Sequence, residues 1–129
     1  PDGLHHLEVY GGTYGDTVRP LEVGWRVGAR WLHTAVAIGT DFEDCDLSIA
    51  TGTEIDFDAV TLGFDLGPRM RARKCDPTDL ASTTTVALRA IFGVRLTPAV
   101  GLFVMGSAGL DVDDAAFVPG FAGGLRFFR

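Results

Sequence analysis

The chain has 129 residues, of which 17 are glycine and 47% are hydrophobic, and its formal net charge at pH 7 is −6. This length predicts one domain over residues 1–129, and the composition is too apolar for an intrinsically disordered protein. The acidic balance argues against a nucleic-acid-binding protein. No stretch approaches the roughly 18 consecutive apolar residues of a transmembrane helix.

Alternation with a period of two is the main pattern in the chain. From Leu21 to Trp31 the odd positions are all apolar, whereas the even positions combine glycine with charge, as at Arg26. A strand places these two sets on opposite faces, and a helix would scatter them. Applied along the chain, the pattern predicts eight strands at 4–14, 20–30, 33–42, 55–65, 69–75, 83–95, 99–110 and 117–128.

The connections between these strands alternate in length. Short turns are expected at 31–33, 67–68 and 97–98, and longer polar loops at 15–19, 43–54, 76–82 and 111–116. In an up-and-down arrangement all the short turns fall at one end, called the lower end here, and all the longer loops at the upper end. The sequence therefore predicts an all-β fold, a closed eight-stranded antiparallel up-and-down transmembrane β-barrel.

Charge follows the same division between loops and strands. Of the 17 acidic residues, most are expected in or beside the upper loops: Asp16, Asp41, Glu43, Asp44, Asp46, Glu54, Asp56, Asp58, Asp76, Asp79, Asp111, Asp113 and Asp114. Most arginines instead lie within predicted strands, on the face opposite the apolar one. A soluble barrel turns its charged face to water, whereas a membrane barrel turns it inward.

Two features favour the membrane barrel. The polar faces mix small residues with long charged ones, which suits a narrow lumen. The apolar faces carry aromatic residues that predict a girdle at the membrane interface, namely Trp25, Trp31 and Phe127.

The hairpin sequence from Arg95 to Leu102 and the closing segment from Gly123 to Phe128 extend this pattern. With them, the whole chain resembles the small eight-stranded outer-membrane β-barrel superfamily, the OmpA/OmpX-like proteins. The resemblance implies a protein of the bacterial outer membrane, in contact with its lipid, and a terminal aromatic residue that serves as an assembly signal. Here Phe127 and Phe128 precede Arg129 instead of ending the chain.

The inward face of such a barrel predicts a charge network in the lumen. An eight-stranded barrel has room only for its own side chains, so buried arginines require acidic partners. The predicted network contains Glu8, Glu22, Arg26, Arg30, Asp65, Arg69, Arg71, Arg73, Arg89, Arg95 and Arg126. Its arginines outnumber its acids, which leaves two hypotheses open: a plug of ion pairs, or a narrow anion-preferring water path.

Cys45 and Cys75 are each expected in a different upper loop. Two cysteines at one end of an exported barrel predict a disulfide that holds the loops together, whereas free thiols would suit a cytosolic protein. The acidic segments 41–46 and 111–114 have two interpretations, a solvated rim or weak binding of divalent cations.

No arrangement of Ser, His and acidic residues predicts a catalytic site, because the histidines are expected near the lower end and the serines higher up. We therefore expect no enzyme, no cofactor and no metal centre. The leading hypothesis is an integral outer-membrane protein with a filled lumen, structural or interactive in the cell envelope, or a subunit of an envelope assembly with other envelope proteins.

A soluble lipocalin-like barrel that binds a small apolar ligand is the alternative from a different class. In that barrel Trp25, Phe92, Leu102 and Val104 would point inward, and Arg26 and Arg89 would point outward. A narrow anion-preferring pore is the third hypothesis.

Overall fold

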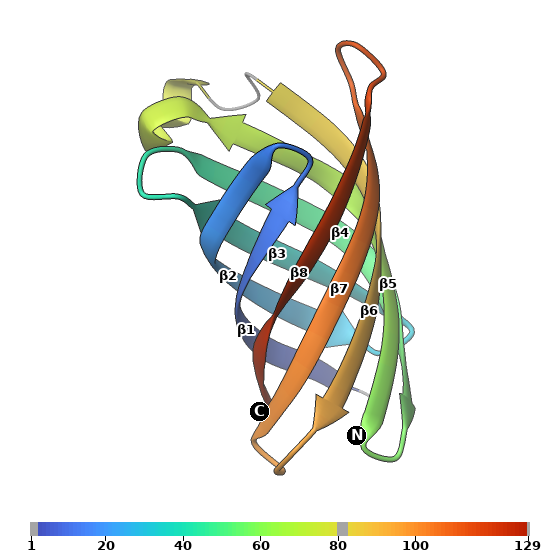
Figure 1. Ribbon diagram of the computed structural model, residues 1–129. Coiled ribbons are helices and arrows are strands. Elements are labelled where there is room, and N and C mark those ends of the chain that lie inside the picture. The colour runs from blue at the N-terminus through green and yellow to red at the C-terminus, as the bar shows by residue number, and fades with distance from the viewer. Residues whose placement is uncertain (1–2, 80–82, 129) are drawn as a thin grey trace.

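The computed structural model describes residues 3–79 and 83–128. Its strands form one closed antiparallel barrel in which each strand pairs with the next and the last pairs with the first (Figure 1). The strands are β1 (Gly3–Tyr14), β2 (Thr17–Ala29), β3 (Leu32–Thr40), β4 (Cys45–Phe57), β5 (Val60–Ala72), β6 (Thr83–Arg95), β7 (Val100–Asp111) and β8 (Phe117–Phe128). The prediction of a closed, eight-stranded, up-and-down antiparallel barrel is confirmed.

The connections give the barrel two different ends. The turns β2–β3, β4–β5 and β6–β7 lie at the lower end with both chain ends, and the remaining connections lie at the upper end (Figure 1). The longest connection, β5–β6, contains two short 3-10 segments, η1 (Arg73–Cys75) and η2 (Pro77–Asp79). Among the described residues, no helix is long and apolar enough to cross a membrane.

Side chains alternate between the lumen and the outside along each strand. In β3, for example, His33 and Ala35 are buried while Val36 and Ile38 are exposed. The largest fully buried side chains of the whole barrel are charged: Arg19, Arg26, Arg126, Glu22 and Asp65. The interior is thus polar and the outer face apolar, the inverse of a water-soluble protein.

The predicted strands 55–65 and 69–75, and the loop predicted at 43–54, are wrong. In the structure β4 occupies Cys45–Phe57, the chain turns at residues 58–59, and β5 continues through Gly67 and Pro68 without a turn. The predicted number of strands is still correct, because the fourth and fifth strands were predicted too far along the chain but neither was omitted.

Gly67 and Pro68 stay within β5 because the strand remains paired with β6 there, while its pairing with β4 is interrupted. The pairing of β4 with β5 skips from Ser48–Arg69 to Thr51–Leu66, so the missing N–H of Pro68 falls in the gap. Gly67 is pressed against β4 there: an added Cβ would overlap the Ile49 carbonyl oxygen and lie 2.6 Å from the Ala50 Cα. Only glycine fits this close approach.

We expect Gly67→Ala to lower the free energy of unfolding by about 1–3 kcal/mol, because the new methyl group has to push β5 away from the backbone of β4. Gly106→Ala is the matched control, since nothing lies within 4 Å of a Cβ added to Gly106. We expect the control to stay within about 0.5 kcal/mol of the parent chain. Urea unfolding in phospholipid vesicles measures both, and equal effects would show that the strands do not approach closely at Gly67.

Candidate functional site: the charged lumen and its upper cavity

A lower cluster of ion pairs crosses the lumen. Arg26 is central to it, with Nε 3.0 Å from Glu8 Oε2 and Nη2 2.7 Å from Asp65 Oδ2. Asp65 also accepts a 3.0 Å hydrogen bond from Arg89 Nη2. Because these residues come from β1, β2, β5 and β6, the cluster ties opposite walls of the barrel together.

Arg126 extends this cluster towards β4. Its Nη2 lies 2.6 Å from Glu8 Oε2, and its Nη1 lies 2.7 Å from Glu54 Oε1. His6 Nε2 lies 3.6 Å from the same Glu54 oxygen. The lower cluster therefore holds three guanidinium groups, of Arg26, Arg89 and Arg126, against the three carboxylates of Glu8, Glu54 and Asp65.

An upper cluster is arranged around Asp46. This carboxylate accepts hydrogen bonds of 3.0 Å from Arg19 Nη2 and 2.8 Å from Arg69 Nε. Arg69 Nη2 also donates to Glu22 Oε1 at 2.7 Å, and the guanidinium stacks 3.8 Å from the centre of the Tyr14 ring. The Tyr14 hydroxyl donates to Glu22 as well, so every charged group in this cluster has an opposite charge beside it.

An apolar cluster occupies another part of the lumen. It consists of Tyr10, Ala37, Ile91, Phe103, Met105 and Ala122. The rings of Tyr10 and Phe103 meet edge to face, with their centres 5.4 Å apart. Together with the two ionic clusters, these side chains fill most of the space that an eight-stranded barrel leaves inside.

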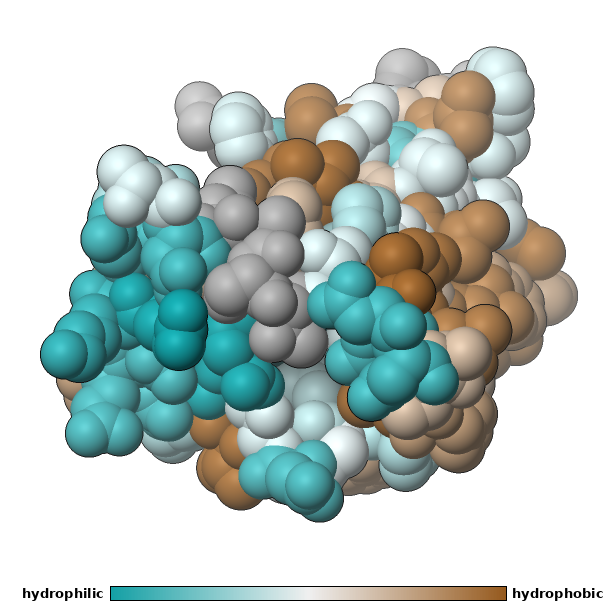
Figure 2. Space-filling model, turned by 90° about the horizontal axis from the view of Figure 1, so that it is seen from above, coloured by the Kyte–Doolittle hydropathy of each residue, from teal (hydrophilic) through white to brown (hydrophobic). Residues whose placement is uncertain are grey.

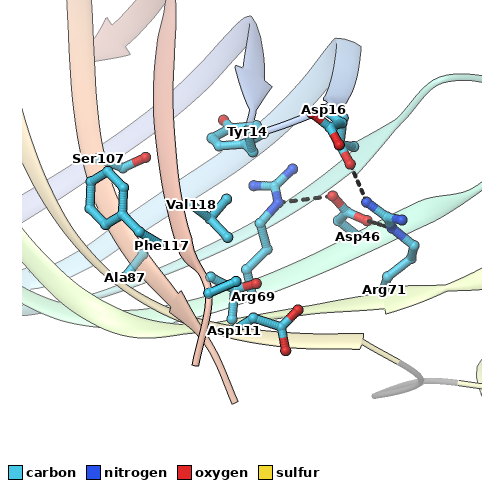
Figure 3. A pocket seen from close by; sticks show the side chains of 14 residues that line it. Tyr14, Asp16, Asp46, Arg69, Arg71, Ala87, Ser107, Asp111, Phe117 and Val118 are labelled. Carbon is cyan, nitrogen blue, oxygen red and sulfur yellow. Dashed lines mark hydrogen bonds and ion pairs between the residues drawn. The ribbon is translucent and has the colours of Figure 1, made fainter. Parts of the chain in front are cut away.

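Free space remains at the upper end, where a cavity of about 380 Å³ opens above Arg69 (Figure 3). Arg69, Arg71 and Asp46 form one side of it, and Ala87, Ser107, Phe117 and Val118 come from the strands opposite. A smaller cavity of about 20 Å³ reaches deeper, to Arg89.

The structure brings together most of the residues predicted for the lumen network. Seven of them are in the two ionic clusters: Glu8, Glu22, Arg26, Asp65, Arg69, Arg89 and Arg126. Arg71 lies at the mouth of the upper cavity, where it donates to Thr17 and approaches Asp46 to 3.8 Å.

Three predicted members lie outside this network. Arg30 is at the lower rim, where it pairs with Asp56. Arg73 is exposed in the β5–β6 connection and pairs with Asp79. Arg95, near the lower end of β6, has its guanidinium 4.0 Å from the centre of the Phe128 ring. These positions lie at strand ends, where alternation no longer fixes the direction of a side chain.

Sequence reasoning missed the buried charges Arg19, Asp46 and Glu54. Asp46 and Glu54 were assigned to an upper loop, although the alternation of Leu47, Ile49 and Ile55 with them marks a strand. Arg19 is inward because β2 carries a bulge: Tyr10 pairs with Glu22 but Gly12 with Arg19, which shifts the alternation by one residue. Once these residues are included, the surplus of arginine predicted for the lumen network disappears from the two ionic clusters.

The predicted acidic upper rim also needs correction. Asp46 and Glu54 lie in the lumen, and Asp56 and Asp58 lie at the lower end. The remaining acids stay at the upper end, in or beside the loops. One of them, Asp41, has its pKa lowered because the backbone N–H groups of Asp44 and Glu43 donate to its carboxylate.

The predicted disulfide between Cys45 and Cys75 is present and joins the start of β4 to the β5–β6 connection. Among the described residues, no group of three or more His, Cys, Asp or Glu side chains is placed to hold a metal ion. Cation binding by the acidic loops stays a prediction.

The predicted girdle residues all point outward. Trp31 lies in the β2–β3 turn at the lower end and is 73% exposed. Phe127 is next to the last residue of β8, and Trp25 lies on the outer face of β2, where its ring meets the His5 ring edge to face.

The orientation of the strands is opposite to that required by the soluble lipocalin-like alternative. Phe92, Leu102 and Val104 are exposed on the outer face, like Trp25, while Arg26 and Arg89 are buried in the lumen. The lumen of this barrel is therefore not an apolar ligand pocket, and that alternative is wrong.

No protein-family model and no curated protein sequence matches the chain. Two solved structures are similar to it. A protein from the de novo design of transmembrane β-barrels has a TM-score of 0.71 at 16% identity, over 98% of this chain and 95% of its own. The solution NMR structure of the designed protein TMB2.3 has a TM-score of 0.59 at 15% identity, over 98% and 94%. These similarities support a small eight-stranded barrel, without a match to the OmpA/OmpX-like family itself.

Proposed function

We propose that the protein is a non-enzymatic integral protein of the bacterial outer membrane, with a structural or interaction role in the cell envelope. The observation that carries this proposal is the outward apolar face. Large hydrophobic side chains are exposed on every strand, among them Leu7, Trp25, Ile38, Ile49, Phe64, Leu88, Val104 and Phe121. In Figure 2, seen from above, hydrophobic residues cover the flank on the right of the view, and hydrophilic residues gather at the left and near the centre.

The backbone supports the same proposal. In the hydrocarbon of a membrane every N–H and C=O group needs a partner within the protein, and a closed barrel supplies these partners without leaving an edge. The strands are mostly 12–13 residues long, which exceeds the roughly 9–11 residues required for a tilted strand to cross the bilayer. Lipid is then the partner of the outer face.

The lumen supports a structural or interaction role more than a pore. Arg26, Arg89 and Arg126 are each paired with carboxylates and are buried, so they offer no continuous row of free positive charge to a passing anion. The narrow anion-preferring pore is therefore the weaker candidate.

Site-directed spin labels on two neighbouring residues of β6 test the membrane proposal. Leu88 is exposed on the outer face, and Ala87 lines the upper cavity. In protein reconstituted into phospholipid vesicles, we expect the Leu88 label to collide with oxygen, which concentrates in lipid. The Ala87 label is expected to collide with a water-soluble nickel chelate instead.

A water-soluble barrel would give a different result. Its Leu88 label would be reached by the nickel chelate even in the presence of vesicles, and the protein would stay monodisperse without detergent. Either outcome would exclude an integral membrane protein.

A further inference from the structure

The upper cavity has the size of a ligand site. Its volume of about 380 Å³ falls within the roughly 300–1,000 Å³ of small-molecule sites. It opens at the upper end of the barrel and is lined on one side by charged residues of β4 and β5 and on the other by β6, β7 and β8 (Figure 3).

The basic side chains of this cavity already have partners in the barrel. Arg69 donates to Asp46 and Glu22 and stacks on the Tyr14 ring. Arg71 donates to Thr17 and lies 3.8 Å from Asp46. An anionic ligand would have to compete with two buried carboxylates for these groups, which disfavours an anion.

Asp111 is in the opposite situation. It ends β7 at the cavity wall, and its carboxylate accepts a 2.9 Å hydrogen bond from the backbone N–H of Asp113. Among the described residues, no Arg, Lys or His side chain forms an ion pair with it. The cavity therefore offers a carboxylate whose charge the protein does not balance.

The wall next to Asp111 combines apolar and hydroxyl side chains. Ala87 and Val118 face the cavity from β6 and β8, beside Thr85 and Ser107 (Figure 3). Around the mouth, the upper connections carry an excess of acids over Arg73 and Lys74: Asp16, Asp41, Glu43, Asp44, Asp76, Asp79, Asp113 and Asp114. Such a rim attracts cations to the opening and repels anions.

We infer that the upper cavity binds a small organic cation with an apolar body, such as an arylalkyl amine. Its ammonium group pairs with Asp111, and its body packs against Ala87 and Val118. Arg69 and Arg71, on the other side of the cavity, repel a second positive group on the ligand. The site therefore selects a cation with a single positive charge. This inference concerns the cavity alone and does not depend on the proposed role in the envelope.

The test uses two probes of similar shape and opposite charge, 2-phenylethylamine and 3-phenylpropionate. Each is titrated by NMR into the full chain in nonionic detergent micelles, at neutral pH and low salt. We expect saturable binding of the amine and none of the carboxylate over the same concentration range. Equal binding of both, or of neither, would overturn the inference, because detergent or a purely apolar cavity does not distinguish charge.

Two matched variants then separate Asp111 from the general charge of the rim. Asp111→Asn keeps the acceptor for the Asp113 N–H and removes one charge, and we expect it to weaken amine binding about tenfold or more. Asp113→Asn removes the same charge from the same connection but is exposed and does not line the cavity. We expect it to change the affinity by less than about twofold at moderate salt.

Equal weakening by both variants would overturn the proposed site, because the rim as a whole would then be responsible. A third variant, Ala87→Leu, fills the cavity from β6 without a change of charge and should abolish amine binding. If Asp111→Asn does not fold, as judged by its β-sheet circular dichroism, Ala87→Leu decides alone: undiminished amine binding in that variant contradicts the inference.

Discussion

Arg26→Ala is expected to lower the free energy of unfolding by about 3–5 kcal/mol, because it leaves the three buried carboxylates of the lower cluster with only two guanidinium groups. Arg26 is 1% exposed and is paired with both Glu8 and Asp65. Because the lower cluster contains equal numbers of guanidinium and carboxylate groups, no spare arginine replaces the lost charge. Urea unfolding in phospholipid vesicles measures the effect.

Arg30→Ala is the control for this experiment. Arg30 pairs with Asp56 at the lower rim, where both side chains are about one-third exposed, and such pairs contribute about 0–1 kcal/mol.

The space left by Arg26 in the Arg26→Ala variant should also admit water and give small, noisy currents in planar bilayers, where the parent chain stays nearly silent. Equally small losses from both variants would show that the lumen is hydrated throughout, and well-resolved channels in the parent chain would place the pore hypothesis first.

Val104→Arg is expected to lower the free energy of unfolding in lipid by about 2–4 kcal/mol, as for arginine on the lipid face near the bilayer midplane. Val104 lies near the middle of β7, is 44% exposed, and pairs with Phe92 and Gly123. Val104→Leu should have almost no effect, because fluid lipid imposes little shape on a side chain and Gly123 leaves room beside it.

The comparison of the two Val104 variants isolates the cost of placing a charge on the lipid face. Both are unfolded by urea from the same vesicles, so the difference between them excludes general effects of mutation at this position. If the arginine variant is as stable as the leucine variant, β7 does not face lipid, and the outward apolar face has to be covered by protein instead.

Periodicity was sufficient to predict the strands whose two faces differ strongly. The strand predicted at 83–95 is β6 to the residue, and the one predicted at 20–30 overlaps β2, Thr17–Ala29. In these strands most bulky apolar residues fall on one face, and glycine and arginine fall on the other. The hydrophobic pattern then fixes both the strand and the face that it turns outward.

Periodicity was not sufficient for β4 and β5. In β4 the apolar outer face is interrupted by Thr51 and Thr53, so its alternation with the polar inner face is lost in the middle of the strand. The partners of the acids on its inner face, Arg19, Arg69 and Arg126, come from three other strands. A sequence window that sees one strand at a time cannot show that a charge is balanced across the lumen.

The same limit applies to the charge network and to the cavity. Apart from Arg19, the arginines of the two ionic clusters were predictable as inward residues. Their balance depends on the bulge in β2 opposite Gly11 and on the register of β4. The upper cavity lies between residues of all the strands except β3. The sequence of any one strand is therefore not sufficient to predict this cavity.

The circular order of the strands has a consequence for assembly. All strand pairs but one join neighbours in the sequence, and the exception, β1 with β8, brings together Glu8 and Arg126 from positions 118 residues apart. The entropy lost on closing a loop grows only with the logarithm of its length, by about 0.6 kcal/mol for each doubling. Hairpins close the shortest loops and can form first. The last step is then the pairing of the free edges of β1 and β8, which costs only a little more entropy than a hairpin. The ion pair between Glu8 and Arg126 forms only when β1 and β8 have paired. It therefore stabilises the closed barrel but does not direct the earlier steps of folding.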